Sequence, residues 1–279
     1  MIPMRDKVSV LERKYHTGNV TLNYGEGLPN GPPLLLIHGS GSVWQDWKPV
    51  IEYFSDLNHL FAIDLRGFGK SDRVSGSYKF SIFTNDIADF IKGVIPTPPI
   101  IVGHSFGALL TADLACQYPD IIKAIVLEDP PVSLLENMVQ WEGWSYFEIA
   151  LEMIRTKTSR KENITRFIEE SGYTPAEAER TARNLEHIDP EIFEQIFYDN
   201  MLDSGENMPT ILGRVQCPCL FISSDHDMGS LVKPEDLPIV KKSLKKGKMV
   251  QIKNVGHSIH LESSDAFNQA VKGFLSQVN

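Results

Sequence analysis

A serine, a histidine and several carboxylates directly follow apolar runs in this chain, where a sheet would bring them to one edge. Ser105 lies in the stretch Gly103-His104-Ser105-Phe106-Gly107, between a run typical of a strand and a run typical of a helix. A serine on so tight a strand-to-helix turn has a strained backbone, and its hydroxyl stands clear of the sheet. Glycines two residues before and after it avoid collisions with the neighbouring strand and helix. The pattern therefore predicts that Ser105 is a nucleophile.

A serine nucleophile needs a base that takes its proton, and the base needs a third group that holds it in the right tautomer. His257 follows the last expected strand, in a Gly-His turn before a helix, and is the preferred base among the eight histidines. His260, three residues further on, is its rival, but we expect it to pack against the final helix.

Four carboxylates compete for the place of the acid. Asp227 lies in the loop after an expected strand, close to where its side chain could reach under His257, and it is the preferred acid. Asp225 lies in the same loop, while Glu128 and Asp129 end the preceding strand. These alternatives stay open, and an acid that is not used would cap a helix or hydrogen-bond a loop.

Strands and helices alternate over most of the chain. A hairpin is expected over 8–24, and continuous apolar runs at 34–37, 60–63, 100–102, 124–127 and 219–223 are typical of strands buried on both faces. Helical spacing of apolar residues marks segments between these runs. The alternation predicts an α/β fold with a mostly parallel sheet, helices on both faces, and the carboxyl ends of its strands along one edge.

This alternation breaks after Pro130-Pro131. From 132 to 212 only helices are expected, one of which starts with the capping box Thr174-Pro175-Ala176-Glu177. Many large apolar side chains on these short helices need a partner surface, and the rim of the sheet is the nearest: Met138, Trp141, Trp144, Tyr146, Phe147, Phe167, Phe193, Phe197, Tyr198, Met201 and Met208. We therefore expect a helical cap at 132–212, inserted between core parts at 1–131 and 213–279.

Four segments resemble successive signatures of the α/β-hydrolase fold family, most closely its capped branch of esterases, lactonases and carbon–carbon bond hydrolases. They are His38-Gly39-Ser40-Gly41, Asp64 to Ser71, Gly103 to Gly107, and Gly256 to Glu262. The order Ser105, Asp227, His257 is also that of the family. The resemblance implies an α/β-hydrolase fold with an inserted cap, and an oxyanion hole made by the backbone N–H groups of Ser40 and Phe106. Where the family often has glycine after the acid-bearing strand, this chain has Ser224, so Asp225 stays an alternative to Asp227.

These residues predict a cofactor-independent serine hydrolase that cleaves a carboxylic ester or lactone through an acyl-enzyme. The aromatic and methionine-rich cap predicts an apolar acyl or alcohol part. One alternative is carbon–carbon bond hydrolysis of a vinylogous diketone, which is disfavoured because relatives with that activity tend to have Gly-Pro-Gly where this chain has Ser40-Gly41-Ser42. Another alternative is a small-molecule receptor that keeps the triad and turns over slowly.

Composition argues against several other classes. Among 279 residues, 27 are basic and 36 acidic, giving a formal net charge of −9, and there is no basic stripe for a nucleic acid. No segment approaches the roughly 20 apolar residues of a membrane span, and no cluster has metal-ligand spacing. Because a signal-peptide pattern is missing and Cys116, Cys217 and Cys219 lack metal or redox spacing, a cytoplasmic location is expected. The sequence leaves the oligomeric state and stereochemical preference open.

Overall fold

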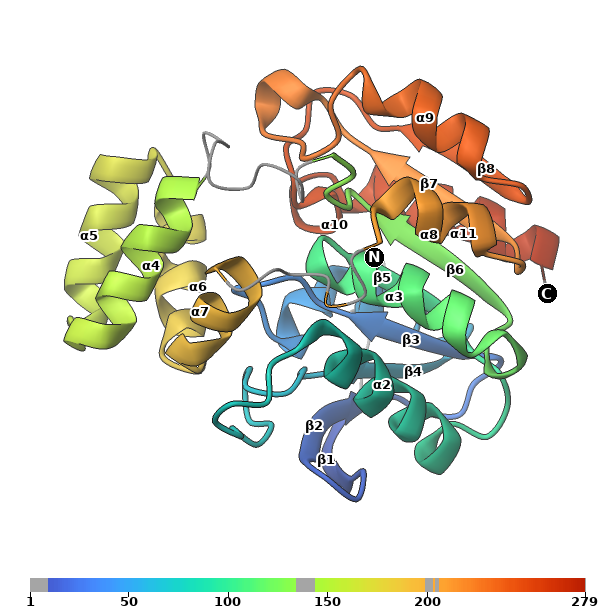
Figure 1. The fold of residues 1–279 in the computed structure, drawn as a ribbon, viewed down its shortest axis with the longest axis horizontal. Coiled ribbons are helices and arrows are strands. Elements are labelled where there is room, and N and C mark those ends of the chain that lie inside the picture. The colour runs from blue at the N-terminus through green and yellow to red at the C-terminus, as the bar shows by residue number, and fades with distance from the viewer. Residues whose placement is uncertain (1–9, 134–143, 199–202, 204–205, 279) are drawn as a thin grey trace, which may run out of the picture.

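An eight-stranded sheet forms the centre of the computed structural model, which describes residues 10–133, 144–198, 203 and 206–278 (Figure 1). Its spatial order is β1-β2-β4-β3-β5-β6-β7-β8. The strands are β1 (Leu11–His16), β2 (Thr21–Glu26), β3 (Pro33–Ile37), β4 (His59–Ile63), β5 (Ile100–His104), β6 (Ala124–Glu128), β7 (Cys219–Ser223) and β8 (Gly247–Gln251). β1 and β2 form the expected antiparallel hairpin, β2 also pairs antiparallel with β4, and the other neighbours are parallel. The mostly parallel sheet predicted from the sequence is confirmed.

The central strands are buried on both faces, as their continuous apolar runs indicate. Every residue of β3, β5, β6 and β7 is buried. Successive residues of a strand point to opposite faces. In β3, accordingly, Leu34 and Leu36 belong to one apolar core, whereas Leu35 and Ile37 belong to the other.

Helices from distant parts of the chain complete the two cores. They and the short 3-10 turns are η1 (Trp44–Trp47), α1 (Lys48–Phe54), α2 (Phe80–Val94), α3 (Phe106–Gln117), η2 (Pro119–Ile121), α8 (Met208–Arg214), η5 (His226–Met228), α9 (Asp236–Ser243), α10 (Ile259–Glu262) and α11 (Ser264–Val278). α1 and α11 contribute Phe54 and Phe267 to the core that contains Leu34. α2 and α3 contribute Phe83 and Leu109 to the other core and lie in front of the sheet in Figure 1.

Four further helices form a group beyond the carboxyl ends of the strands, at the left of Figure 1. They are α4 (Trp144–Thr156), α5 (Arg160–Ser171), α6 (Pro175–Leu185) and α7 (Pro190–Tyr198), and α5 packs on α6 and α4 on α7. The expected capping box opens α6, because the Thr174 N–H donates to Glu177 Oε2 across 2.8 Å. α8 packs instead against α3 and α9, although it lies inside the range 132–212. The limits of the inserted unit therefore stay a prediction.

Part of the expected cap lies outside the described residues. This applies to Met138, Trp141 and Met201 and to the side chains of Trp144, Phe197 and Tyr198. The N-terminal segment 1–9, which belongs to the expected core, also lies outside the described residues. Within the part of the chain that the structure describes, no helix has both the length and the apolar character needed to cross a membrane.

Candidate active site

Ser105 occupies a sharp turn between β5 and α3. Its backbone has φ 53° and ψ −117°. Such sparsely populated conformations cost on the order of 1–3 kcal/mol and persist where surrounding structure enforces them. Here the Ser105 N–H donates to the carbonyl of Glu128 on β6 across 2.9 Å, and its carbonyl accepts from the Ala108 N–H at 3.0 Å. The strained turn predicted from the sequence is therefore present.

The two glycines that flank this turn are required by close backbone contacts. A Cβ atom on Gly107 would lie 2.4 Å from the carbonyl oxygen of Ile37 and 2.5 Å from that of His38. On Gly103 it would lie 2.4 Å from the Gly107 carbonyl oxygen. Backbone atoms cannot move aside as the end of a flexible side chain can, so only glycine fits at both positions.

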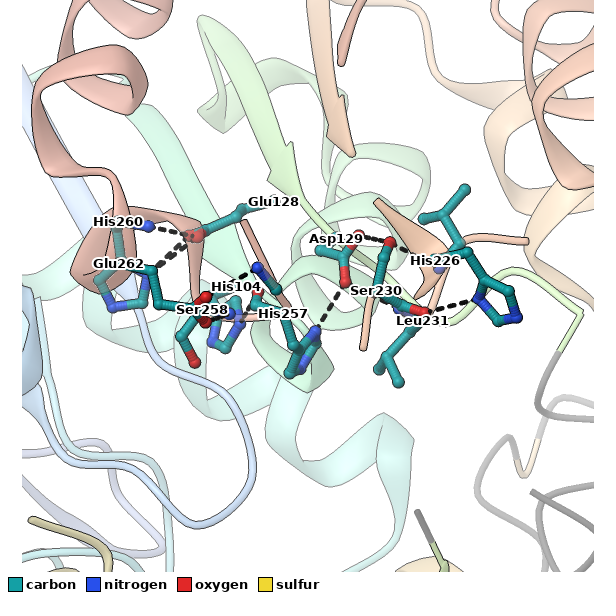
Figure 2. A network of polar contacts seen from close by, with 12 residues as sticks. His104, Glu128, Asp129, His226, Ser230, Leu231, His257, Ser258, His260 and Glu262 are labelled. Atoms are coloured by element: carbon teal, nitrogen blue, oxygen red, sulfur yellow. Dashed lines mark hydrogen bonds and ion pairs between the residues drawn. The ribbon is translucent and has the colours of Figure 1, made fainter. Parts of the chain in front are cut away.

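His257 is held by an acid at the end of β6. Its Nδ1 lies 2.7 Å from Oδ2 of Asp129 (Figure 2). A carboxylate only accepts hydrogen bonds, so Nδ1 carries the proton and, in the neutral ring, Nε2 keeps its lone pair. His257 and Ser105 line the same cavity. The structure thus brings the expected serine and the expected base to one site, together with Asp129.

The preference for Asp227 as the acid needs correction. Asp227 is exposed on η5, and the described structure shows no hydrogen bond or ion pair between it and His257. Asp225 accepts a hydrogen bond from the Asn254 N–H at 2.6 Å, so it holds the loop instead. β6 lies between β5 and β7, and its end is therefore closer to the serine turn than the loop after β7.

The loop after β7 supplies donors to the acid in place of the acid itself. Asp129 is fully buried and has φ 44°, which lets its side chain turn at the end of β6. Its carboxylate accepts from the Ser230 hydroxyl and from the Leu231 N–H at 2.9 Å, besides His257. These donors satisfy the lone pairs that burial removes from water. The carboxylate is therefore fixed in both position and direction.

A second acid–histidine pair lies beside the first (Figure 2). Glu128, the last residue of β6, accepts from the backbone N–H of His260 at 2.8 Å and faces its Nδ1 at 2.9 Å. Burial raises the pKa of Glu128 to about 7 and lowers the pKa of His260 to about 3, so His260 is neutral. Its ring stacks on Trp47, with centroids 4.2 Å apart, and approaches Phe267 of the final helix at 6.1 Å.

His104, directly before the nucleophile candidate, supports His257 through its backbone. Its Nε2 donates to the His257 carbonyl across 3.1 Å, and burial lowers its pKa, which keeps the ring neutral. His257 is thus held at its ring by Asp129 and at its carbonyl by His104.

Potential metal-ligand atoms of His104, Glu128 and His260 also lie within 4.8 Å of one another, a grouping that sequence spacing did not predict. Each of the three already has a hydrogen-bond partner in the protein.

The loop after β3 approaches the serine turn closely. His38 supports this loop, because its Nδ1 donates to the Gly39 carbonyl at 2.8 Å and its Nε2 accepts from the Leu65 N–H at 3.1 Å. Burial lowers the pKa of His38, and the neutral ring fits these two roles. A Cβ on Gly39 would lie 2.9 Å from the Ser105 Cβ.

Phe106 is the first residue of α3, so its N–H has no partner within the helix. Ser40 and Phe106 stay the predicted oxyanion-hole donors.

Ser105 and His257 open into a cavity of about 510 Å³. Apolar and aromatic lining comes from Tyr146, Phe147, Tyr173, Met228, Leu231 and Leu261, and polar lining from residues that include Ser40, Ser42, Asp46, Glu170, Glu177, Arg180, Thr181, Asn184 and Glu262. The cavity is more polar than the sequence predicted. Aromatic side chains of the expected cap, such as Phe167 and Phe193, pack in the apolar core instead of lining the cavity. The polar positions on α6 had no signal in the sequence that separates them from an ordinary solvated helix face.

Residues 34–270 match the alpha/beta hydrolase family. The chain belongs to this family. The fold and the resemblance predicted from the sequence are therefore confirmed, and the family supports hydrolase chemistry.

Proteins that are similar to this chain are named for several different activities. The (E)-2-((N-methylformamido)methylene)succinate hydrolase of Acinetobacter baylyi is 25% identical over 282 residues, which cover 93% of this chain and 95% of that protein. Lipase 1 of Psychrobacter immobilis is 25% identical over 253 residues, covering 88% of this chain and 77% of the lipase. The crystal structure of the N-formylmaleamic acid deformylase from Pseudomonas putida has a TM-score of 0.79 at 18% identity, and covers 94% of this chain and 100% of that one. This last likeness shows the shared fold.

Proposed function

We propose that this chain is a serine hydrolase that cleaves a small carboxylic ester or lactone through an acyl-enzyme on Ser105. The observation that carries the proposal is the 2.7 Å contact of His257 Nδ1 with Asp129, at a cavity that Ser105 also lines. This contact fixes the tautomer in which Nε2 can accept the serine proton. Nothing in the proposed chemistry requires a cofactor.

The reaction follows from the roles of these groups. His257 Nε2 takes the proton of the Ser105 hydroxyl as its oxygen attacks the substrate carbonyl. Asp129 keeps the ring oriented and stabilises the imidazolium that forms. The N–H groups of Ser40 and Phe106 donate to the tetrahedral oxyanion, and each such donor is worth about 100- to 1000-fold in turnover. His257 then protonates the leaving alcohol and afterwards activates the water that releases the acid.

The relatives support acyl-bond hydrolysis and widen the range of leaving groups. A lipase acts on esters, whereas the Acinetobacter baylyi relative is named for an N-acylated methylenesuccinate. Cleavage of such an N-acyl group is therefore the second candidate, with an amine in place of the alcohol. The ester or lactone stays first, because the leaving alcohol asks less of His257 as a general acid.

Fluorophosphonate labelling combined with active-site variants tests the proposed nucleophile. The wild-type protein should take up one label at Ser105, and Ser105→Ala should take up none. Ser105→Ala and His257→Ala should each lower the turnover of a p-nitrophenyl ester by at least about 1000-fold. Ser258→Ala, which changes another serine of the cavity lining, is the matched control and should keep both labelling and turnover. Wild-type turnover in Ser105→Ala would refute the proposal.

A substrate panel then separates the reaction types. It should contain an ester chain-length series, lactones, an N-acyl substrate and a vinylogous diketone, and each should be assayed with wild type and Ser105→Ala. Preferred turnover of the vinylogous diketone would establish the carbon–carbon alternative on the same residues. Tight binding across the panel with negligible turnover would indicate a receptor.

A further inference from the structure

Helix α6 turns a polar face toward the cavity that contains Ser105. Glu177, Arg180, Thr181 and Asn184 all line it, at spacings of three, four and seven residues from the first. Residues with this spacing lie on one side of an α-helix. The side of α6 nearest the serine therefore offers charge and hydrogen bonds to a substrate rather than an apolar surface.

The acidic side chains of the cavity lining already have partners. Asp46 accepts from Asn184 Nδ2 at 2.7 Å, Glu170 from Arg166 Nε at 2.8 Å, Glu177 from the Thr174 N–H at 2.8 Å, and Glu262 from the Gly256 N–H at 2.7 Å. These carboxylates therefore maintain the walls of the cavity, and part of their hydrogen-bonding capacity is used before a ligand enters.

Arg180 is the contrasting case. Among residues 10–133, 144–198, 203 and 206–278, no hydrogen-bond acceptor or carboxylate pairs with its guanidinium. Its side chain is half-buried, and its charge acts on the buried ring of His260, on the phenol of Tyr146 and on the carboxylate of Glu177. A cation that is partly withdrawn from water gains most from an anion placed against it.

Asn184, one turn further along α6, adds an independent observation. Its Nδ2 donates to Asp46, which only accepts, and this contact fixes the orientation of the amide. Its Oδ1 is then buried, and no donor among the described residues reaches it, although Asn184 lines the cavity. A buried acceptor without a partner is unfavourable until a donor arrives. The cavity thus offers a cation that has no hydrogen-bonded partner among the described residues and, one helical turn away, an acceptor that has no donor there.

We propose that Arg180 and Asn184 form a substrate subsite, and that Ser105 acts on the half-ester or half-amide of a dicarboxylic acid. Arg180 binds the free carboxylate, where its planar guanidinium can donate two parallel hydrogen bonds. Asn184 Oδ1 accepts from an N–H or O–H of the same substrate. The inference rests on the proposed function, because it places the scissile carbonyl at Ser105 and the carboxylate at α6.

Matched substrates test this subsite in the wild-type protein. Monomethyl glutarate and methyl pentanoate differ by a terminal carboxylate in place of a methyl group, and hydrolysis of both can be followed by acid release. The half-ester should have a kcat/KM at least about 10-fold higher, mainly through a lower KM. An equal or higher kcat/KM for the neutral ester would overturn the subsite while leaving the proposed nucleophile intact.

Variants of α6 assign the preference to its residues. Arg180→Met should lower kcat/KM for the half-ester about 100-fold and for the neutral ester less than about threefold, and Arg180→Lys should restore part of the loss. Arg155→Met is the control, because Arg155 on α4 pairs with Glu194 and does not line the cavity, and it should keep the preference. An unchanged preference in Arg180→Met would refute the role of Arg180.

Asn184 and correct folding need their own measurements. A half-ester with a neighbouring hydroxyl should bind more tightly than one without it, and Asn184→Leu should abolish that difference. An advantage that persists in Asn184→Leu would remove Asn184 from the subsite.

Fluorophosphonate labelling of each variant reports whether Ser105 and its base are intact. Loss of labelling in wild type would count against the proposed function, whereas normal labelling without a carboxylate preference would count against the subsite alone.

Discussion

Asp129 Oδ2 lies 2.7 Å from Nδ1 of His257, although 128 residues separate them in the sequence. Asp129 directly follows β6, Ser105 directly follows the neighbouring strand β5, and His257 lies beyond β8. The acid and the serine thus come from the ends of adjacent strands. The loop after β7 contributes the Ser230 hydroxyl and the Leu231 N–H that hold the acid in place.

Asp129→Asn should therefore be far more damaging to activity than Asp227→Asn. An asparagine at 129 can accept from His257 or present its own N–H, and the wrong ring tautomer then removes the base, which costs about 10,000-fold in kcat. Asp227 is exposed, so its replacement should change kcat by less than about twofold. Hydrolysis of a p-nitrophenyl ester by both variants is the measurement. A large loss in Asp227→Asn with normal activity in Asp129→Asn would show that the loop moves to the histidine during turnover.

The sequence predicts the parts of this molecule that depend on local pattern. Runs of apolar residues identified the central strands. Glycine at 103 and 107 identified the strained turn, because only a residue without a Cβ atom fits those contacts. The Thr174 capping box also identified the start of α6. In each case the signal and its structural consequence lie within a few residues of one another.

The choice of the acid was beyond that kind of reasoning. Asp129 and Asp227 both follow strands that end at the same edge, and the outcome depends on the positive φ of Asp129 and on donors a hundred residues away. The polarity of the cavity was hidden for a similar reason. Arg180 and Asn184 lie on an amphipathic helix, and only the packing of α6 shows which face meets the cavity.

Gly107→Ala should lower the free energy of unfolding by about 1–3 kcal/mol, because the new methyl group would press on the carbonyls of Ile37 and His38. Gly213→Ala is the control, since a Cβ there meets no atom within 4 Å and α8 gains from alanine by about 0.5–1 kcal/mol. Urea unfolding of both variants provides the comparison. Equal stability in the two would mean that the turn relaxes easily.

A buried ion pair that joins the glycine-rich loop after β4 to α2 should be sensitive to the loss of one partner. Arg66 donates to Asp86 through Nε at 2.7 Å and through a second nitrogen at 2.8 Å, with side chains 4% and 5% exposed. Asp86→Ala leaves a buried guanidinium unpaired and should lower the free energy of unfolding by about 3–5 kcal/mol.

The double variant Arg66→Met with Asp86→Leu should recover most of this loss, because it removes both charges. Glu52→Ala breaks the exposed pair with Lys48 and should cost less than about 1 kcal/mol. Thermal unfolding of the three variants and of wild type measures these differences in stability. A cost for Asp86→Ala as small as that for Glu52→Ala would show that water reaches Arg66.

Glu128 should make the stability of the protein depend on pH in a direction unusual for a carboxyl group. Burial raises the pKa of Glu128 from 4.5 to about 7. Between these two pH values the folded protein therefore binds more protons at Glu128 than the unfolded chain does. Stability contributed by the protonated group is therefore lost as pH rises from 4.5 towards 7. The lowered pKa of His260 makes stability rise with pH between about pH 3 and pH 6.5. This contribution is the same in wild type and in any variant that keeps His260 buried.

Comparison with Glu128→Gln isolates this effect, because glutamine keeps an acceptor for the His260 N–H and cannot ionise. The free energy of unfolding of wild type minus that of the variant should fall between about pH 5 and about pH 7.5, measured with urea. A difference that stays constant or grows with pH would mean that Glu128 is ionised throughout. His260 would then donate to a full carboxylate.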